Sequence, residues 1–228
     1  MSWGAGYELD AAHPTMLAAH KHFYDSGIVG RTSWFGVPIG KCPNDMVSYA
    51  NLFHAVLPDL VVETGTNYGG SAFYFAHLLD LLASNPADQR RRVLTIDPFP
   101  CPEGERPDHP RITYLHGSSL DPWIVTLVAA QARGKRVLVI LDSVHEGNHV
   151  MREILAYAAF VCDGSYLVVE DTNLNGHPVA PQHGAGPMEA VEAFLGQTDD
   201  FVVDESFQPF GMSMSPRGFL RRVTGRPL

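Results

Sequence analysis

Five short apolar runs, separated by segments of helical spacing, constrain the fold of this chain more than any other feature. The runs occupy residues 60–63, 93–97, 112–115, 137–141 and 166–170. Their length and their content of Val, Ile and Leu are typical of strands buried on both faces of a parallel sheet. Residues 71–82 and 150–160 have helical spacing between such runs, which favours strand–helix–strand connections. The pattern predicts an α/β fold with helices on both faces of a mostly parallel sheet.

The last third of the chain and its start depart from this alternation. After residue 170 comes a loop rich in Gly, Pro and His, HPVAPQHGAGP, and then a helix is expected at 188–195. The runs FVVDES and GFLRRV read as two more strands, which could pair as a hairpin at one sheet edge and give about seven strands in all. The first forty residues contain no strand-like run and indicate a helical extension. A single α/β domain carrying this extension accounts for the whole chain.

Charge and cysteine content narrow the class of protein. The formal net charge is −9, and no basic face is evident, which argues against a nucleic-acid partner. The three cysteines have no metal-ligand spacing and fit reduced thiols. The start MSWGAGYELD lacks a signal-peptide pattern, and no apolar stretch reaches the roughly 18 residues of a membrane span. We therefore expect a soluble cytoplasmic protein that binds no membrane, and the N-terminal extension suggests a homo-oligomer.

The first candidate binding motif, VVETGTNYGGSAFYFA, follows the first strand. Glycines Gly65, Gly69 and Gly70 have the spacing GxxxGG instead of the GxGxxG of dinucleotide-binding folds. Glu63 at the strand end suits a cationic or zwitterionic ligand such as S-adenosylmethionine, and Asp97 at the end of the second strand could accept hydrogen bonds from ribose hydroxyls. The alternative is that the glycines only form a tight turn and Asp97 only ends a strand.

The second motif, LDSVHEGNH, follows the fourth strand. Asp142 ends that strand, His145 lies three residues further on, and the fifth strand ends in Glu170 and Asp171. The carboxyl ends of neighbouring parallel strands lie together, so these three carboxylates could converge on a hard cation such as Mg²⁺. The alternatives are a solvated turn for the paired carboxylates and a solvent-facing side chain for His145. His149, one helical turn beyond His145, could share its face.

Together these motifs resemble a known family. The run FYDSGIVGRTSWFGVPIGKCPNDMVSYANLFHAVLPDLVVETGTNYGGSAFYFA, with LDSVHEGNHVMREILAYAAFVCDGSYLVVEDTN, GPMEAVEAFL and SPRGFLRR, resembles the cephalosporin hydroxylase and rhamnosyl O-methyltransferase family. The resemblance implies a Rossmann-like class I methyltransferase fold that uses S-adenosylmethionine and magnesium. It also implies an N-terminal helical extension or cap at residues 1–45 and a methyltransferase domain at residues 46–228.

The resemblance assigns expected roles to individual residues. The layout is similar to that of catechol O-methyltransferase, with Asp142, Glu170 and Asp171 as metal ligands and His145 as the catalytic base in the place of a lysine. Asp97 would hold the ribose and Asp142 would also border the cofactor. Ser118 and Ser119 would lie near the adenine. The residues expected around the methionine end of the cofactor are Glu63, Gly65, Asn67 and Ser71. Thr66 and Gly69 are also expected to bind the cofactor.

The expected function is O-methylation of a hydroxyl on a sugar or polyol moiety of a natural product, such as an antibiotic. His145, largely neutral at cytoplasmic pH, would accept the hydroxyl proton. The loop at 173–187 is the expected wall over the acceptor. Two other classes stay open, a nucleotide-dependent oxidoreductase and a non-catalytic partner protein of an oxidative pathway. The sequence names neither the acceptor nor the preferred metal, and it leaves the roles of His149, His177 and His183 open.

Overall fold

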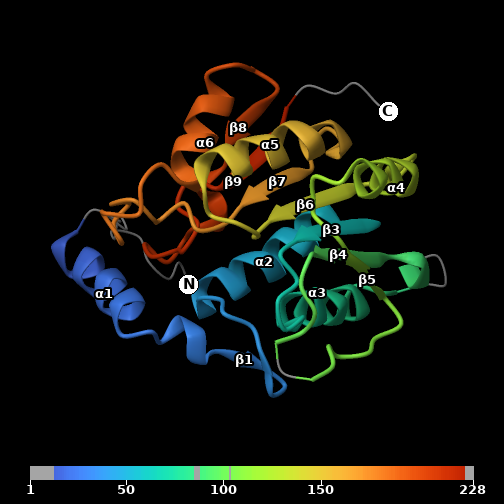
Figure 1. Ribbon diagram of the computed structural model, residues 1–228, viewed down its shortest axis with the longest axis horizontal. Coiled ribbons are helices and arrows are strands. Elements are labelled where there is room, and N and C mark those ends of the chain that lie inside the picture. Colours follow the sequence, from blue (N-terminus) through green and yellow to red (C-terminus); the bar gives the residue numbers. More distant parts are fainter. Residues whose placement is uncertain (1–12, 85–87, 103, 224–228) are drawn as a thin grey trace, which may run out of the picture.

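The computed structural model describes residues 13–84, 88–102 and 104–223. A seven-stranded sheet in the order β5-β4-β3-β6-β7-β9-β8 forms its centre (Figure 1). The strands β3 to β7 are parallel to one another, and β9 is antiparallel to β7 and to β8. The predicted mostly parallel sheet and its edge hairpin are therefore confirmed. The strands are β3 (Leu60–Thr64), β4 (Arg92–Asp97), β5 (Ile112–His116), β6 (Val137–Leu141), β7 (Tyr166–Val169), β8 (Phe201–Val203) and β9 (Phe219–Arg222).

Helices cover both faces of the sheet because its central strands are apolar on both sides. In β3, Leu60 and Val62 pack into one core cluster, while Val61 packs into the other. The first cluster is covered by α4 (Pro122–Ala132), α5 (Gly147–Tyr157) and α6 (Pro187–Leu195). The second is covered by α2 (Pro43–Val56) and α3 (Gly70–Leu81), which Figure 1 shows on the opposite side. The result is a Rossmann-like three-layer arrangement, as predicted.

The strand order brings the chemistry-bearing strand ends together. Strand β3 lies between β4 and β6. The chain therefore adds β4 and β5 on one side of β3 and then β6 and β7 on the other side. In open α/β sheets, ligands bind at the carboxyl ends of the strands where the order reverses in this way. The segments that follow β3, β4, β6 and β7 all start from this edge.

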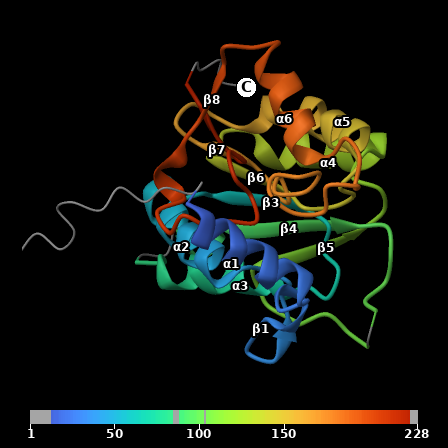
Figure 2. The same cartoon turned by 90° about the vertical axis from the view of Figure 1, so that its left-hand side faces the viewer.

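The N-terminal extension is not purely helical, so that expectation is wrong in part. Helix α1 (Pro14–Asp25) is followed by a small antiparallel hairpin formed by β1 (Ser33–Trp34) and β2 (Val37–Pro38). Two-residue strands carry too short a pattern to be recognised by alternation. Helix α1 lies beside the loop after β7, where His20 Nε2 and Asn173 Nδ2 are 3.0 Å apart (Figure 2).

The predicted domain boundary between residues 45 and 46 falls inside helix α2, which begins at Pro43. Residues 1–12 of the predicted extension lie outside the described residues. None of the helices in the described part of the chain combines the length and apolar character needed to span a lipid bilayer. The 3-10 turns are η1 (Val29–Arg31), η2 (Asp88–Arg90), η3 (Ala158–Phe160) and η4 (Glu205–Phe207).

Candidate active site

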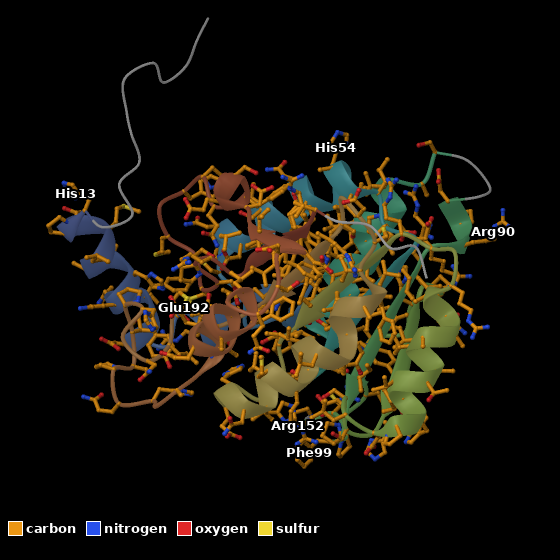
Figure 3. All side chains as sticks on the ribbon, turned by 90° about the horizontal axis from the view of Figure 1, so that it is seen from above. His13, His54, Arg90, Phe99, Arg152 and Glu192 are labelled. Atoms are coloured by element: carbon orange, nitrogen blue, oxygen red, sulfur yellow. The ribbon has the colours of Figure 1, made fainter. Side chains whose placement is uncertain are left out.

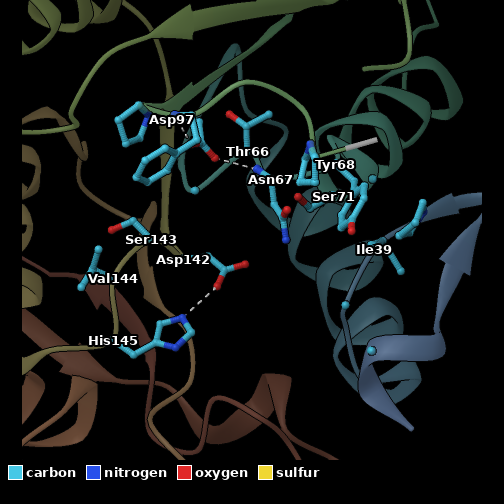
Figure 4. Close-up of a pocket in the computed structure, with 18 of the residues that line it drawn as sticks. Ile39, Thr66, Asn67, Tyr68, Ser71, Asp97, Asp142, Ser143, Val144 and His145 are labelled. Carbon is cyan, nitrogen blue, oxygen red and sulfur yellow. Dashed lines mark hydrogen bonds and ion pairs between the residues drawn. The ribbon is translucent and has the colours of Figure 1, made fainter. Parts of the chain in front are cut away.

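A cavity of about 600 Å³ opens at the carboxyl ends of the central strands (Figure 4). Its walls come from the turn after β3, the segment that ends β4, the loop after β6 and Asp171 after β7. The N-terminal extension completes the wall with Gly30 and with Pro38, Ile39 and Gly40. The extension therefore forms part of the site and does not only cover the sheet.

Two glycines of the turn after β3 are required by contacts with other backbone segments. At Gly65, with φ of +88°, an added Cβ would lie 1.8 Å from the carbonyl oxygen of Asp142. At Gly70 it would lie 2.2 Å from the carbonyl oxygen of Pro38. The first contact joins the ends of β3 and β6, and the second joins α3 to the hairpin. These glycines thus assemble the cavity walls, a role that the glycine spacing alone did not reveal.

Gly65→Ala is expected to destabilise the fold by roughly 3 kcal/mol or more, because it combines a strained positive φ with a backbone clash. Gly134→Ala is the matched control, since Gly134 also has a positive φ, of +67°, but has no neighbouring atom within 4 Å. Urea denaturation of both variants measures the difference. Equal losses of stability in the two variants would contradict the contact between the ends of β3 and β6.

Glu63 is a completely buried acid at the floor of this turn. Thr95 Oγ1 donates a hydrogen bond of 2.6 Å to Glu63 Oε2, while Oε1 has no hydrogen-bond partner among the described residues. Burial raises the pKa of Glu63 to about 7, against the opposing charge of Lys41. Ser71 also lowers the pKa of Glu63. However, neither Ser71 nor Lys41 donates a hydrogen bond to Oε1. The unpaired oxygen favours a ligand that brings a donor or a positive charge.

Asp97 lines the cavity with its carboxylate held by two backbone amides. Its Oδ2 accepts from the Asn67 amide at 2.7 Å, and its Oδ1 accepts from the Phe99 amide at 2.8 Å. Arg106 Nη2 lies 3.7 Å from Oδ2. The Phe99 side chain is 71% exposed and lies at the outer surface of the molecule (Figure 3). The two amides therefore fix the orientation of the Asp97 carboxylate before any ligand binds, and the exposed Phe99 side chain is close to it in the same segment.

The predicted cofactor residues divide into two groups. Glu63, Gly69, Ser118 and Ser119 are not among the residues that line the cavity in the described part of the chain. Ser118 donates its amide to Asp121 Oδ2, and the Ser119 carbonyl accepts from the Tyr157 hydroxyl. These hydrogen bonds do not test the predicted contact of the two serines with adenine, which stays a prediction. The predicted residues that do line it are Gly65, Thr66, Asn67, Ser71, Asp97 and Asp142.

Asp142, His145 and Asp171 form a cluster at the cavity wall. His145 Nε2 lies 2.9 Å from Asp171 Oδ2 and 3.7 Å from Asp142 Oδ1. Each residue offers one ligand atom, and these atoms lie within 4.8 Å of one another. Figure 4 shows the side chains of Asp142 and His145 pointing toward each other, with a dashed line that marks their ion pair. The sequence-based prediction that the ends of β6 and β7 converge is confirmed for these three residues.

The protonation state of His145 differs from the prediction. Burial lowers the pKa of His145, but hydrogen bonds and charges of Asp142 and Asp171 outweigh it and raise the pKa to about 10. With only protein groups around it, the imidazole is therefore protonated at neutral pH, and the expectation of a largely neutral histidine is wrong for this state. The imidazolium is a cation held between two carboxylates.

Glu170 does not join this cluster, although it is adjacent to Asp171. Its two oxygens accept hydrogen bonds from Lys41 Nζ, both at 2.7 Å, and Oε1 also accepts from the Tyr49 hydroxyl at 2.5 Å. Burial and the charge of Asp142 raise the pKa of Glu170. Asp171 has a positive φ of 54°, which turns the backbone between the two acids. The adjacent carboxylates thus serve different partners, and the predicted ligand role of Glu170 requires it to leave Lys41.

Lys41 was missed by the sequence-based reasoning. Its side chain is 2% exposed and its ammonium also donates to Asp142 Oδ2 at 2.9 Å. The available signal was a lone lysine in the run VPIGKCP, before a helix whose first residue is a proline. Nothing local identified its partners, because Asp142 and Glu170 lie 101 and 129 residues away.

The other candidate histidines have partners away from the cluster. His149 Nε2 lies 3.5 Å from Glu153 Oε1, and His177 Nε2 lies 3.0 Å from Glu189 Oε1. His183 Nδ1 lies 3.3 Å from the carbonyl oxygen of Gly184. None of the three is among the residues that line the cavity in the described part of the chain.

Comparison with known proteins extends these observations. A family model described as Rhamnosyl O-methyltransferase/CmcI matches residues 26–223. A rhamnosyl O-methyltransferase of Mycobacterium tuberculosis is 37% identical over 211 residues, which cover 89% of this chain and 83% of the relative. The protein of the same name from Mycobacterium leprae is 34% identical over 210 residues, covering 89% and 88%.

Solved structures share the fold. A CmcI structure with Mg and SAM has a TM-score of 0.61 and 23% identity, and the match covers 86% of this chain and 78% of that chain. The apo structure of CalS11, a TDP-rhamnose 3'-O-methyltransferase, has a TM-score of 0.56 and 17% identity, with 78% of each chain covered. These likenesses confirm the predicted methyltransferase-type fold.

Proposed function

The chain belongs to the rhamnosyl O-methyltransferase/CmcI family, and from this membership we propose that it is an S-adenosylmethionine-dependent and Mg²⁺-dependent O-methyltransferase. The proposed acceptor is a hydroxyl of a sugar or polyol moiety in a small-molecule natural product. The relatives named for rhamnosyl O-methylation support this acceptor class. The observation that carries the proposal is a single cavity joining the glycine turn, Asp97 and the cluster of Asp142, His145 and Asp171.

The residues present fit the proposed cofactor. The acidic side chains that line the cavity, those of Asp97, Asp142 and Asp171, suit the positive amino and sulfonium groups of S-adenosylmethionine. Asp97 would accept hydrogen bonds from the ribose, and Asn67 and Ser71 would lie toward the methionine end. When bound, the cofactor supplies an electrophilic methyl group. The cavity holds the two reactants together, which removes much of the entropic cost of their encounter.

The donor set also fits the proposed metal. Asp142 and Asp171 supply hard oxygen ligands, which Mg²⁺ prefers. When bound, Mg²⁺ supplies a Lewis acid that lowers the pKa of a substrate hydroxyl. His145 Nε2, which faces both carboxylates, is the proposed acceptor for the hydroxyl proton. A cation held by Asp142 and Asp171 would weaken the interactions that keep His145 protonated, and so would free Nε2 for this role.

Location and assembly are part of the proposal. A cytoplasmic location is supported by the cysteine content, because three cysteines without metal-ligand spacing fit reduced thiols. A homo-oligomer is supported by two large apolar side chains at the surface, Phe35 and Leu81, which are 79% and 81% exposed. Light scattering of the purified chain measures the assembly state.

Ligand binding and turnover test the proposed function. S-adenosylhomocysteine should raise the melting temperature of the chain and NADH should not, which separates a methyltransferase from a nucleotide-dependent oxidoreductase. Methyl transfer from labelled S-adenosylmethionine to rhamnosylated acceptors should require Mg²⁺ and stop with a chelator. Binding without transfer to any acceptor of the panel would favour the non-catalytic partner protein, and undiminished transfer in excess chelator would contradict the metal site.

Asp97→Ala is expected to weaken S-adenosylhomocysteine binding by about 1 to 3 kcal/mol, the usual scale for leaving buried hydrogen-bonding groups unpaired. The groups left unpaired on binding are the ribose hydroxyls, whereas the Asn67 and Phe99 amides lose their acceptor with or without ligand and so affect mainly the stability of the fold. Calorimetry measures the change. Asp199→Ala is the control, because Asp199 is an exposed carboxylate outside the cavity lining, and this variant should bind normally. Unchanged affinity in a folded Asp97→Ala variant would remove Asp97 from the cofactor site.

A further inference from the structure

Arg106 binds the same two residues that hold the Asp97 carboxylate. Its Nε donates to the carbonyl oxygen of Asn67 at 2.8 Å, and its Nη2 donates to the carbonyl oxygen of Phe99 at 2.9 Å. The amides of Asn67 and Phe99 donate in turn to the two oxygens of Asp97, and Figure 4 shows the first of these bonds. Asn67 and Phe99 are thus each held twice, by Asp97 at the amide and by Arg106 at the carbonyl.

This ring of hydrogen bonds joins two segments that are distant in the sequence. Asn67 lies in the turn after β3, whereas Phe99 and Arg106 lie in the connection between β4 and β5. Asn67 has a positive φ of 47°, a conformation that side-chain-bearing residues seldom adopt without support. At Gly69 in the same turn, an added Cβ would lie 3.2 Å from Pro107 Cδ and 3.4 Å from Arg106 Cβ. The turn therefore packs directly against the segment that carries Arg106.

Strand β5 fixes Arg106 in this position. The Arg106 guanidinium lies 5.8 Å from the centroid of the Tyr114 ring, within the range of a cation–π contact. The Tyr114 hydroxyl donates to the carbonyl oxygen of Pro107 at 2.7 Å. The Arg106 side chain is 12% exposed, and Arg106 is not among the residues that line the cavity in the described part of the chain. An effect of Arg106 on a ligand in the cavity therefore has to pass through the residues that Arg106 holds.

We propose that Arg106 is a positioning residue of the cofactor site, which orients the Asp97 carboxylate by holding the backbone of Asn67 and Phe99. A guanidinium suits this role because its N–H groups have a fixed planar arrangement, whereas a lysine ammonium is a point charge. This inference rests on the proposed S-adenosylmethionine-dependent function. It goes beyond that function by assigning part of the cofactor affinity to a residue outside the cavity.

Two substitutions of Arg106 separate its geometry from its charge. Arg106→Met keeps an apolar stem and removes both donors, so S-adenosylhomocysteine should bind about tenfold more weakly. Arg106→Lys keeps the charge but cannot hold both carbonyl oxygens in the same way, so its affinity should lie within about threefold of that of Arg106→Met. Arg133→Met is the matched control, because Arg133 is exposed at the end of α4 and its loss changes the net charge equally. Isothermal titration of the full chain measures the affinities, at a temperature where thermal melting shows every variant to be folded.

A double variant and a second ligand distinguish positioning from a merely structural role. In Asp97→Ala the carboxylate that Arg106 orients is absent, so adding Arg106→Met should weaken S-adenosylhomocysteine binding by less than about threefold more. Methylthioadenosine has the ribose but no amino-acid group, and Arg106→Met should weaken its binding by the same factor as that of S-adenosylhomocysteine. A merely structural role would lower the melting temperature and leave both affinities of the folded chain unchanged. If Arg106→Met does not fold, Arg106→Lys and its combination with Asp97→Ala decide the question.

Wild-type affinity for S-adenosylhomocysteine in folded Arg106→Met or Arg106→Lys would overturn the inference. A further loss of about tenfold in the double variant would also overturn it, because Arg106 would then act independently of Asp97. Normal binding of methylthioadenosine by Arg106→Met would do the same, since the effect would then lie away from the ribose. A wild-type chain that binds no S-adenosylhomocysteine would overturn the proposed function, and the inference with it. Wild-type binding combined with any of the other three results overturns the inference alone.

Discussion

Asp142→Asn should abolish measurable Mg²⁺ binding and lower methyl transfer by about 10³-fold or more. The estimate follows from the several kcal/mol of transition-state stabilisation that a Lewis-acidic metal supplies. The substitution keeps the shape of the side chain but converts the carboxylate into an uncharged amide, in which an NH2 group replaces one oxygen. Asp142 is the residue at which Lys41, His145 and the cavity meet. Calorimetry with Mg²⁺ and single-turnover methyl transfer measure the two effects.

Asp199→Asn is the control for this variant, because Asp199 is an exposed carboxylate near the edge strand β8 and its loss changes the net charge by the same amount. Far-ultraviolet circular dichroism establishes that both variants are folded. A folded Asp142→Asn variant that binds Mg²⁺ as tightly as the wild type would refute the assignment of Asp142 as a ligand.

The fold was predictable because its signals are local and repeated. Each apolar run is short enough to be a strand, and the runs of the central strands β3 and β6 are buried on both faces, as the helices on each side of the sheet require. The convergence of Asp142 and Asp171 followed from the same pattern, since parallel strands place their carboxyl ends at one edge. The extension was less predictable, because the strands of its hairpin have only two residues each.

The internal chemistry of the site was not predictable from local sequence. Glu170 and Asp171 are neighbours in the sequence, yet Glu170 contacts Lys41 and Asp171 contacts His145. Lys41 carries no local signature, since its partners come from segments more than a hundred residues away. The pKa of His145 depended on how close the two aspartates lie, which spacing along the chain does not give. These three features depend on the packing of segments that are distant in the sequence, whereas the fold could be predicted from the local periodicity of apolar residues.

His145→Ala should lower turnover by about 10² to 10⁴, the usual range for general-base catalysis, while S-adenosylhomocysteine binding stays close to that of the wild type. His145→Gln keeps a hydrogen-bonding group near Asp171 but cannot accept the proton, so it should be equally slow. His177→Ala is the matched control, because His177 also pairs with a carboxylate, that of Glu189, but lies outside the cavity lining. Single-turnover methyl transfer with saturating Mg²⁺ measures the three variants.

The pH dependence separates a proton-accepting His145 from one that only packs beside the carboxylates. Without metal, the pKa of His145 is raised from its usual value of about 6.5 to about 10, so its pairing stabilises the fold fully below about pH 6.5 and is lost as the pH rises through about 10. The difference in melting temperature between the metal-free wild type and His145→Ala should therefore shrink with rising pH. With Mg²⁺, the wild-type rate should rise with pH as His145 loses its proton, and that rise should be absent in His145→Ala. If the turnover of His145→Ala were within a few-fold of that of the wild type and had the same pH profile, the general-base role of His145 would be wrong. The proposed metal site would not be affected by that result.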